Sequence, residues 1–149
     1  MIDFSVTTPF RLVRMLATAG YNTPSIYLLI CEAVALEAVQ ADTEAELKVQ
    51  LGLSLRSLPA SGVRPERIED ALGSEASGTI PLVILDQWLP KLVASFDRNV
   101  VLLATNGTVL LLGTREIAER TLAAAPNLRN RVTDVLSIRP DQVFGDLSV

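Results

Sequence analysis

The stretch NVVLLATNGTVLLLGT, residues 99–114, constrains the fold of this chain more than any other part of its sequence. Two apolar runs flank one Asn-Gly pair, and Asn and Gly tolerate the positive φ angles that a type I′ turn requires. The pattern therefore predicts a β-hairpin in which residues 100–105 pair with residues 108–113. Neither run has a polar face, so helices of the chain or a partner protein must cover both faces.

Two other segments have the pattern of strands. In residues 47–55, apolar and polar side chains alternate at period two, which is typical of a strand with one buried face. Residues 79–85, TIPLVIL, form a short apolar run that ends at Asp86. Together with the hairpin, these segments predict a sheet of about four strands.

Two threonine-proline pairs predict an N-terminal helical hairpin. Thr8-Pro9 and Thr23-Pro24 each combine an N-cap residue with proline at the first helical position. The first helix is expected to end at Gly20. The second helix, over residues 24–41, is apolar nearly all the way round, so it must lie in the core or at an interface.

The predicted fold is therefore mixed α and β (α+β), with helices that cover the sheet. Helices are also expected after Asp86 and from residue 115 to about 124, and Pro126 either ends the latter helix or starts another one. A length of 149 residues fits a single domain over residues 1–149. Residues 59–78, rich in proline, glycine and serine, predict a flexible internal loop, and residues 143–149 predict a loose C-terminal tail.

The residue types that are missing from the sequence exclude most catalytic systems. There is no histidine and only one cysteine, so Ser-His-Asp triads, Cys-His pairs, and histidine or thiolate metal sites cannot be built. The glycine-rich phosphate-binding motifs are also missing. We therefore predict no catalytic residue, no metal site and no cofactor, and we favour a non-enzymatic role.

Charge and hydropathy set expectations for partners and location. A net charge of −4 repels nucleic acid, which makes nucleic acid an unfavoured partner. The longest apolar segment, residues 26–39, is too short to span a membrane and contains Glu32 and Glu37. The N-terminus has no signal-peptide pattern, and the lone Cys31 fits a reducing compartment, so we expect a cytoplasmic protein.

One pattern distributed along the chain points to a nucleotide site. An apolar strand that ends in an acid (TIPLVILDQ) precedes a helix, a second strand with a polar tip (NVVLLATNG) and a later segment with arginines (APNLRNRVTDVLSIRP). This order resembles the second half of the AAA+ and STAND-type P-loop NTPases. The resemblance implies that Asp86 is the metal-side acid, that Asn106 senses the γ-phosphate, and that Arg129 or Arg131 is the trans-acting arginine.

The chain departs from that family at two places. The upstream segment that should bind phosphate, ATAGYNTPS at residues 17–25, has one glycine and no lysine, so it lacks the main anion site. Gln87 stands where a catalytic glutamate would follow the acid. The resemblance therefore implies a degenerate nucleotide-site domain that lacks a functional phosphate loop.

The function that these features favour is a protein–protein interaction or assembly module, which works as an oligomer or as a subunit of a complex. Acids gather between residues 32 and 46 and arginines between residues 98 and 139, a distribution that suits head-to-tail protein contacts. The interaction candidates are apolar side chains of the predicted central helix and hairpin: Ile26, Leu29, Ile30, Leu36, Leu110 and Leu112.

The degenerate nucleotide-site domain is the alternative, and strand pairing separates the two hypotheses. Parallel pairing between residues 79–85 and residues 100–105 would favour the nucleotide site. Direct antiparallel pairing across Asn106-Gly107 would weaken it.

Overall fold

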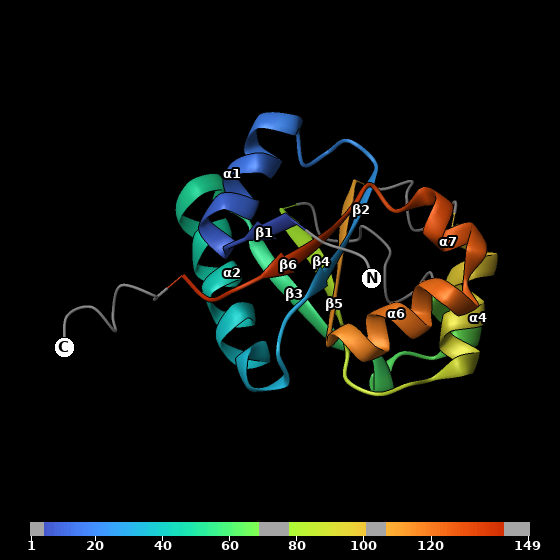
Figure 1. Cartoon of the computed structure of the whole chain (residues 1–149). Coiled ribbons are helices and arrows are strands. Elements are labelled where there is room, and N and C mark those ends of the chain that lie inside the picture. Colours follow the sequence, from blue (N-terminus) through green and yellow to red (C-terminus); the bar gives the residue numbers. More distant parts are fainter. Residues whose placement is uncertain (1–4, 69–77, 101–106, 142–149) are drawn as a thin grey trace.

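In the computed structural model, the described residues form a six-stranded, all-parallel sheet with the order β1-β6-β2-β5-β4-β3 (Figure 1). The structure describes residues 5–68, 78–100 and 107–141. The prediction of a mixed α and β fold is confirmed, but the sheet is larger than the four strands expected. The strands are β1 (Ser5–Thr7), β2 (Ser25–Ile30), β3 (Ser54–Pro59), β4 (Thr79–Leu85), β5 (Thr108–Gly113) and β6 (Asp134–Ile138).

Helices cover both faces of this sheet (Figure 1). α1 (Pro9–Ala19) and α2 (Leu36–Leu51) pack on one face, and α4 (Pro90–Arg98), α6 (Arg115–Ala124) and α7 (Pro126–Arg131) pack on the other. Connections that run from β1 towards β3 use the first face, and those that return from β4 to β6 use the second, as crossovers of one hand require. Short 3-10 helices are η1 (Ala33–Ala35), η2 (Ala60–Gly62) and η3 (Pro65–Arg67).

The two central strands, β2 and β5, lie side by side and are buried along their whole length. Alternate side chains of these strands enter opposite cores. Ile26 and Val109 belong to the core beneath α4, α6 and α7, whereas Leu29 and Leu110 belong to the core beneath α1 and α2. The apolar runs therefore lack a polar face because helices of this chain cover both sides of the sheet.

The predicted β-hairpin is wrong. Its second run forms β5, but both edges of β5 are occupied by parallel neighbours, β2 and β4. Residues 101–106, including Asn106, lie outside the described part of the chain. Gly107 does have a positive φ of 99°, and a Cβ atom there would lie 3.1 Å from the Tyr21 carbonyl oxygen. The glycine therefore permits a close approach to the turn before β2.

The predicted helix over residues 24–41, and with it the N-terminal helical hairpin, is also wrong. Residues 25–30 form β2, and the helix begins only at Leu36. A segment that is apolar on all sides fits a central parallel strand as well as a buried helix, and periodicity does not distinguish them. The first helix, α1, is confirmed: the Thr8 hydroxyl accepts a bond from the Arg11 backbone N–H at 3.3 Å, and Gly20 is the C-cap.

The strand predicted at residues 47–55 is shifted along the chain. Leu47 belongs to α2, whose buried residues are spaced four apart (Val39, Thr43 and Leu47). Val49 on the same helix is 81% exposed. Gly52 ends α2 with a φ of 67°, and β3 follows from Ser54. The alternation of apolar residues thus crosses a helix terminus, and its period of two has no structural counterpart.

Other predicted elements are confirmed or corrected in detail. β4 has the predicted bounds, residues 79–85, and α6 has the predicted bounds, residues 115–124. The predicted loop at 59–78 contains η2 and η3, and its Ala60, Val63 and Ile68 are buried in the core. Residues 69–77 and the predicted tail at 143–149 lie outside the described residues.

Candidate functional site

The carboxyl ends of β2 and β5 mark the point where the chain leaves the sheet in opposite directions. β2 continues into η1 and α2 on one face, and β5 continues into α6 on the other. Adjacent strands whose connections diverge in this way leave a crevice outside their carboxyl ends, and open α/β sheets bind ligands there.

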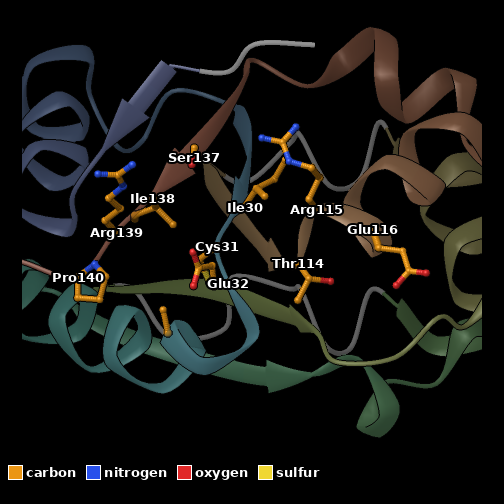
Figure 2. Close-up of a pocket in the computed structure, with 11 residues that line it drawn as sticks. Ile30, Cys31, Glu32, Thr114, Arg115, Glu116, Ser137, Ile138, Arg139 and Pro140 are labelled. Atoms are coloured by element: carbon orange, nitrogen blue, oxygen red, sulfur yellow. The ribbon is translucent and has the colours of Figure 1, made fainter. Parts of the chain in front are cut away.

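A cavity of about 770 Å³ occupies this place (Figure 2). Its volume lies within the range of small-molecule binding sites. The lining residues come from the ends of β2, β5 and β6 and from the segments that follow them: Ile30, Cys31, Glu32, Ala35, Thr114, Arg115, Glu116, Ser137, Ile138, Arg139 and Pro140.

Strand register holds the three lining segments together. The Cys31 backbone N–H donates to the Gly113 carbonyl oxygen at 3.0 Å, and Ile30 pairs with Ser137 across β2 and β6. Gly113 also packs closely on β4, since a Cβ atom at that position would lie 3.1 Å from the Leu85 Cβ atom. The segments that line the cavity are therefore anchored to the central strands of the sheet.

At the amino ends of the strands, opposite the cavity, polar side chains hydrogen-bond to one another and to the backbone. At the amino ends of β2 and β5, the Ser25 and Thr108 hydroxyl oxygens lie 3.0 Å apart, and the Thr108 hydroxyl donates to the Tyr21 carbonyl oxygen at 3.0 Å. The Thr133 hydroxyl oxygen accepts a bond from the Ile26 backbone N–H at 3.1 Å. These groups therefore satisfy one another's hydrogen bonds at the amino ends of the strands.

The charges around the cavity are mixed. Arg115 and Arg139 contribute guanidinium groups, and Glu32 and Glu116 contribute carboxylates. Arg115 also lies 3.6 Å from Glu119 on the exposed side of α6, a contact that solvent weakens. In the view of Figure 2, Arg139 and Arg115 stand on either side of the Cys31–Glu32 segment.

Cys31 is a neutral lining group. Burial raises the pKa of its thiol, and the negative charge of Glu32 adds a smaller increase, so that the pKa is about 11. The thiolate that nucleophilic chemistry requires is therefore scarce at neutral pH. The site has the groups to bind a polar, charged molecule, but its cysteine is not activated for catalysis.

The first turn of α6 faces the cavity. Thr114 is the N-cap, but its side chain makes no capping bond, and Glu116 lies in the first turn. Backbone N–H groups at a helix start favour negative charge. Thr114 is the polar residue that directly follows β5.

Asp86, the metal-side acid implied by the resemblance to P-loop NTPases, is at the tip of β4 but does not line the cavity. Its carboxylate accepts bonds from the Ser61 hydroxyl at 3.0 Å and from the Ser61 backbone N–H at 3.4 Å. These bonds give Asp86 a structural role, because they tie the end of β4 to η2. Asn106 precedes β5, so it is not at the tip of the described strand.

Arg129 and Arg131 lie far from the cavity in the fold. Both are exposed in the last turn of α7, which leads into the amino end of β6. The cavity lies at the carboxyl ends of the strands, so these arginines belong to the opposite edge of the sheet. They do not contribute to the site of their own chain.

The apolar interaction candidates are core residues of this chain. Leu36 is half-buried against the core beneath α1 and α2. The other five candidates are buried: Ile26, Leu29, Ile30, Leu110 and Leu112. An interaction surface would therefore have to be built from other residues. Ile30 is the one member of this set that also lines the cavity.

Sequence reasoning did not select Thr114, Arg115, Ser137 or Arg139 as site residues. Thr114 has a recognisable signal, a cap residue directly after an apolar run. Ser137 and Arg139 have none, because no strand was predicted over residues 134–138. Their role follows only from the pairing of β6 with β2.

No protein-family model matches the chain, and no curated protein matches it. Within residues 5–68, 78–100 and 107–141, no group of three or more side chains is arranged to hold a metal ion. No helix in this part of the chain is long and apolar enough to cross a membrane.

Proposed function

We propose that the chain is a ligand-binding α/β domain of the nucleotide-site type, which binds a small phosphorylated molecule at the carboxyl-end cavity without hydrolysing it. The observation that carries the proposal is the place of the cavity of about 770 Å³, at the strand ends where β2 and β5 diverge to opposite faces. β4 pairs in parallel with β5, residues 108–113, as strands do in open α/β sheets that bind ligands at their carboxyl ends. Residues 101–105, whose pairing with residues 79–85 would favour a nucleotide site, lie outside the described part of the chain.

The lining residues favour binding over hydrolysis. Arg115 and Arg139 present guanidinium groups, which bind phosphate oxygens through charge-assisted hydrogen bonds. No lysine is among the lining residues in the described part of the chain, and the sequence has no Gly-x-x-x-x-Gly-Lys motif. The groups that neutralise a triphosphate in its transition state are therefore missing.

Thermal unfolding with added ligands tests this proposal. Inorganic phosphate, AMP and ATP, with and without Mg²⁺, would be titrated while the midpoint of unfolding is measured. A ligand that binds only the folded state adds about 2.7 kcal/mol at a hundred times its Kd, so the midpoint should rise with concentration. No rise with any of these compounds at millimolar concentration would refute the proposal.

A pair of matched variants localises the binding. Ala35 lines the cavity, and Ala94 is exposed on α4. Ala35→Phe fills part of the cavity and should abolish the rise, whereas Ala94→Phe should leave it unchanged. Trp88 is the single tryptophan, and the guanidinium carbon of Arg120 on α6 lies 4.4 Å from the centroid of its ring. Its fluorescence therefore gives a second readout of binding near α6.

A second candidate function, self-association, is favoured by the distribution of charge over the two faces. Opposite charges on opposite faces suit head-to-tail contacts between copies. The helices of the first face, α1 and α2, together have four acids and three bases, with all the acids on α2 (Glu37, Asp42, Glu44, Glu46, Lys48, Arg11 and Arg14). α4, α6 and α7 together have six bases and three acids (Lys91, Arg98, Arg115, Arg120, Arg129, Arg131, Asp97, Glu116 and Glu119).

Sedimentation velocity at two ionic strengths tests self-association. At about 0.02 M salt, the mean mass should rise with protein concentration. At about 0.5 M salt, the mean mass should be lower at the same protein concentration, because salt screens exposed charges. The double variant Arg129→Glu/Arg131→Glu should remain monomeric at low salt. A chain that is monomeric under both conditions would rule out this candidate.

A further inference from the structure

We infer that the ligand of the carboxyl-end cavity is a phosphorylated sugar with a single phosphate group, either free or as part of a nucleotide, and that it binds without a divalent metal. This inference rests on the proposed function and narrows it to one ligand chemistry. It follows from the balance of charge in the cavity, the spacing of the strand ends and the kind of side chain that lines each part.

Charge balance limits the number of phosphate groups. The cavity has two guanidinium groups, of Arg115 and Arg139, and two carboxylates, of Glu32 and Glu116. These four groups sum to no net charge, and Arg115 is also paired with Glu119, so a single phosphate group, with a charge close to −2 at neutral pH, adds less unbalanced negative charge than two or three would. A triphosphate would bring further negative charge close to two carboxylates, and no lysine lines the cavity to offset it.

The strand order gives room for a sugar between the two arginines. β2 lies between β5 and β6, and neighbouring strands lie about 4.8 Å apart, so the tips that carry Arg115 and Arg139 are about 10 Å apart. Figure 2 shows Ser137 between the two guanidinium groups in this view, with Glu32 below them. A phosphate held by Arg139 would therefore place the sugar over the Cys31–Glu32 segment, between Arg139 and Arg115.

The carboxylate and the apolar lining suit the remainder of such a ligand. A carboxylate accepts bonds from neighbouring sugar hydroxyl groups, and Glu32 supplies one at the end of β2. Ile30, Ala35, Ile138 and Pro140 provide apolar contact surface. The lining contains no aromatic residue in the described part of the chain, so stacking of a base contributes little and the sugar phosphate carries most of the affinity.

Isothermal titration calorimetry with four probes tests this inference on the full chain. Ribose 5-phosphate and AMP should bind with Kd values within about tenfold of each other, and inorganic phosphate more weakly. ATP should bind at least about tenfold more weakly than AMP, and Mg²⁺ should not strengthen the binding of AMP. AMP that binds more than tenfold more tightly than ribose 5-phosphate would overturn the leading role of the sugar phosphate.

Two other outcomes separate the failure of this inference from that of the proposed function. Tightest binding of ATP with Mg²⁺ would overturn the single-phosphate inference and leave the nucleotide-site proposal standing. No binding of any probe would overturn both.

Variants assign the contacts to particular side chains. Arg139→Gln should weaken every phosphate-containing probe by about tenfold or more, and Arg14→Gln, an exposed change on α1, should have no effect. Glu32→Gln should weaken ribose 5-phosphate but not inorganic phosphate, because only the former has hydroxyl groups. Glu44→Gln on α2 is the matched control. Equal effects of Glu32→Gln on both probes would contradict the role given to Glu32.

Discussion

At the scale of single residues, Gly113 shows how the packing of β5 on β4 depends on one missing side chain. It lies at the end of β5, between β2 and β4, where a Cβ atom would be 3.1 Å from the Leu85 Cβ atom. A Cβ atom at this position would make an unusually tight contact, and Leu85 would have to shift by a few tenths of an ångström to relieve it. The φ angle of Gly113 is not positive, so its backbone conformation does not favour glycine. The contact with Leu85 is the feature that favours glycine at this position.

Gly113→Ala should therefore destabilise the fold. We expect a loss of about 1–3 kcal/mol in the free energy of unfolding, the usual cost of overpacking, as measured by urea denaturation. Gly62→Ala is the control, because a Cβ atom there meets nothing within 4 Å. Equal stability of the two variants would contradict the close packing of β4 on β5.

Cys31 illustrates how burial suppresses chemistry in the cavity. Its thiol has a pKa raised to about 11, so the neutral form is favoured in the folded chain. The contribution to stability is present below the unfolded pKa near 9 and is lost as pH rises towards 11. Cys31→Ser should reduce this alkaline loss of stability.

Thiol labelling measures the same property directly. At pH 8, the native chain should react with a disulfide reagent much more slowly than the urea-unfolded chain. Fast labelling in the native state would show an accessible thiolate and would contradict the burial of Cys31.

At the scale of elements, α7 depends on a side chain from another helix. Asp97 of α4 accepts bonds from the backbone N–H groups of Asn127 at 2.7 Å and Leu128 at 3.1 Å. α7 has only six residues and no capping bond from its own N-cap, so this carboxylate holds its first turn. α7 in turn delivers the chain to β6 and thus to one side of the cavity.

Asp97→Ala should cost about 1 kcal/mol of stability, the typical value for a lost helix cap. Asp97→Asn retains an acceptor oxygen and should restore most of the loss. Urea denaturation of the three proteins measures the effect. Identical destabilisation by Ala and Asn would point to the charge of Asp97, and not to its hydrogen bonds, as the source of stability.

At the scale of the whole molecule, stability should decrease from the centre of the sheet to its edges. β2 and β5 are fully buried and have a hydrogen-bonded neighbour on each side, whereas β1 and β3 are edge strands. Val6 in β1 is 52% exposed. The central strands therefore belong to the most cooperative unit of the fold.

Native-state hydrogen exchange tests this gradient. Backbone amides of β2 and β5 should exchange most slowly, with protection close to the global free energy of unfolding, and those of β1 should exchange faster. Added ligand should increase protection at the start of α6 and at the end of β6. Uniform protection across the sheet would contradict the gradient.

The sequence by itself determined the elements whose signals are local. The cap residues and prolines gave α1 and α6, a short apolar run gave the bounds of β4, and the missing histidines excluded whole classes of chemistry. Local signals suffice for these features because each depends on backbone geometry or on residue type within a few positions.

The tertiary structure alone decided the identity of β2, the parallel sheet and the site. Residues 25–30 are apolar on all sides, so only their neighbours β5 and β6 make them a strand rather than a helix. The cavity joins residues 30–35, 114–116 and 137–140, which are distant in sequence and meet only through strand pairing. Pairing partners are chosen by the burial of whole faces, and no local pattern encodes that choice.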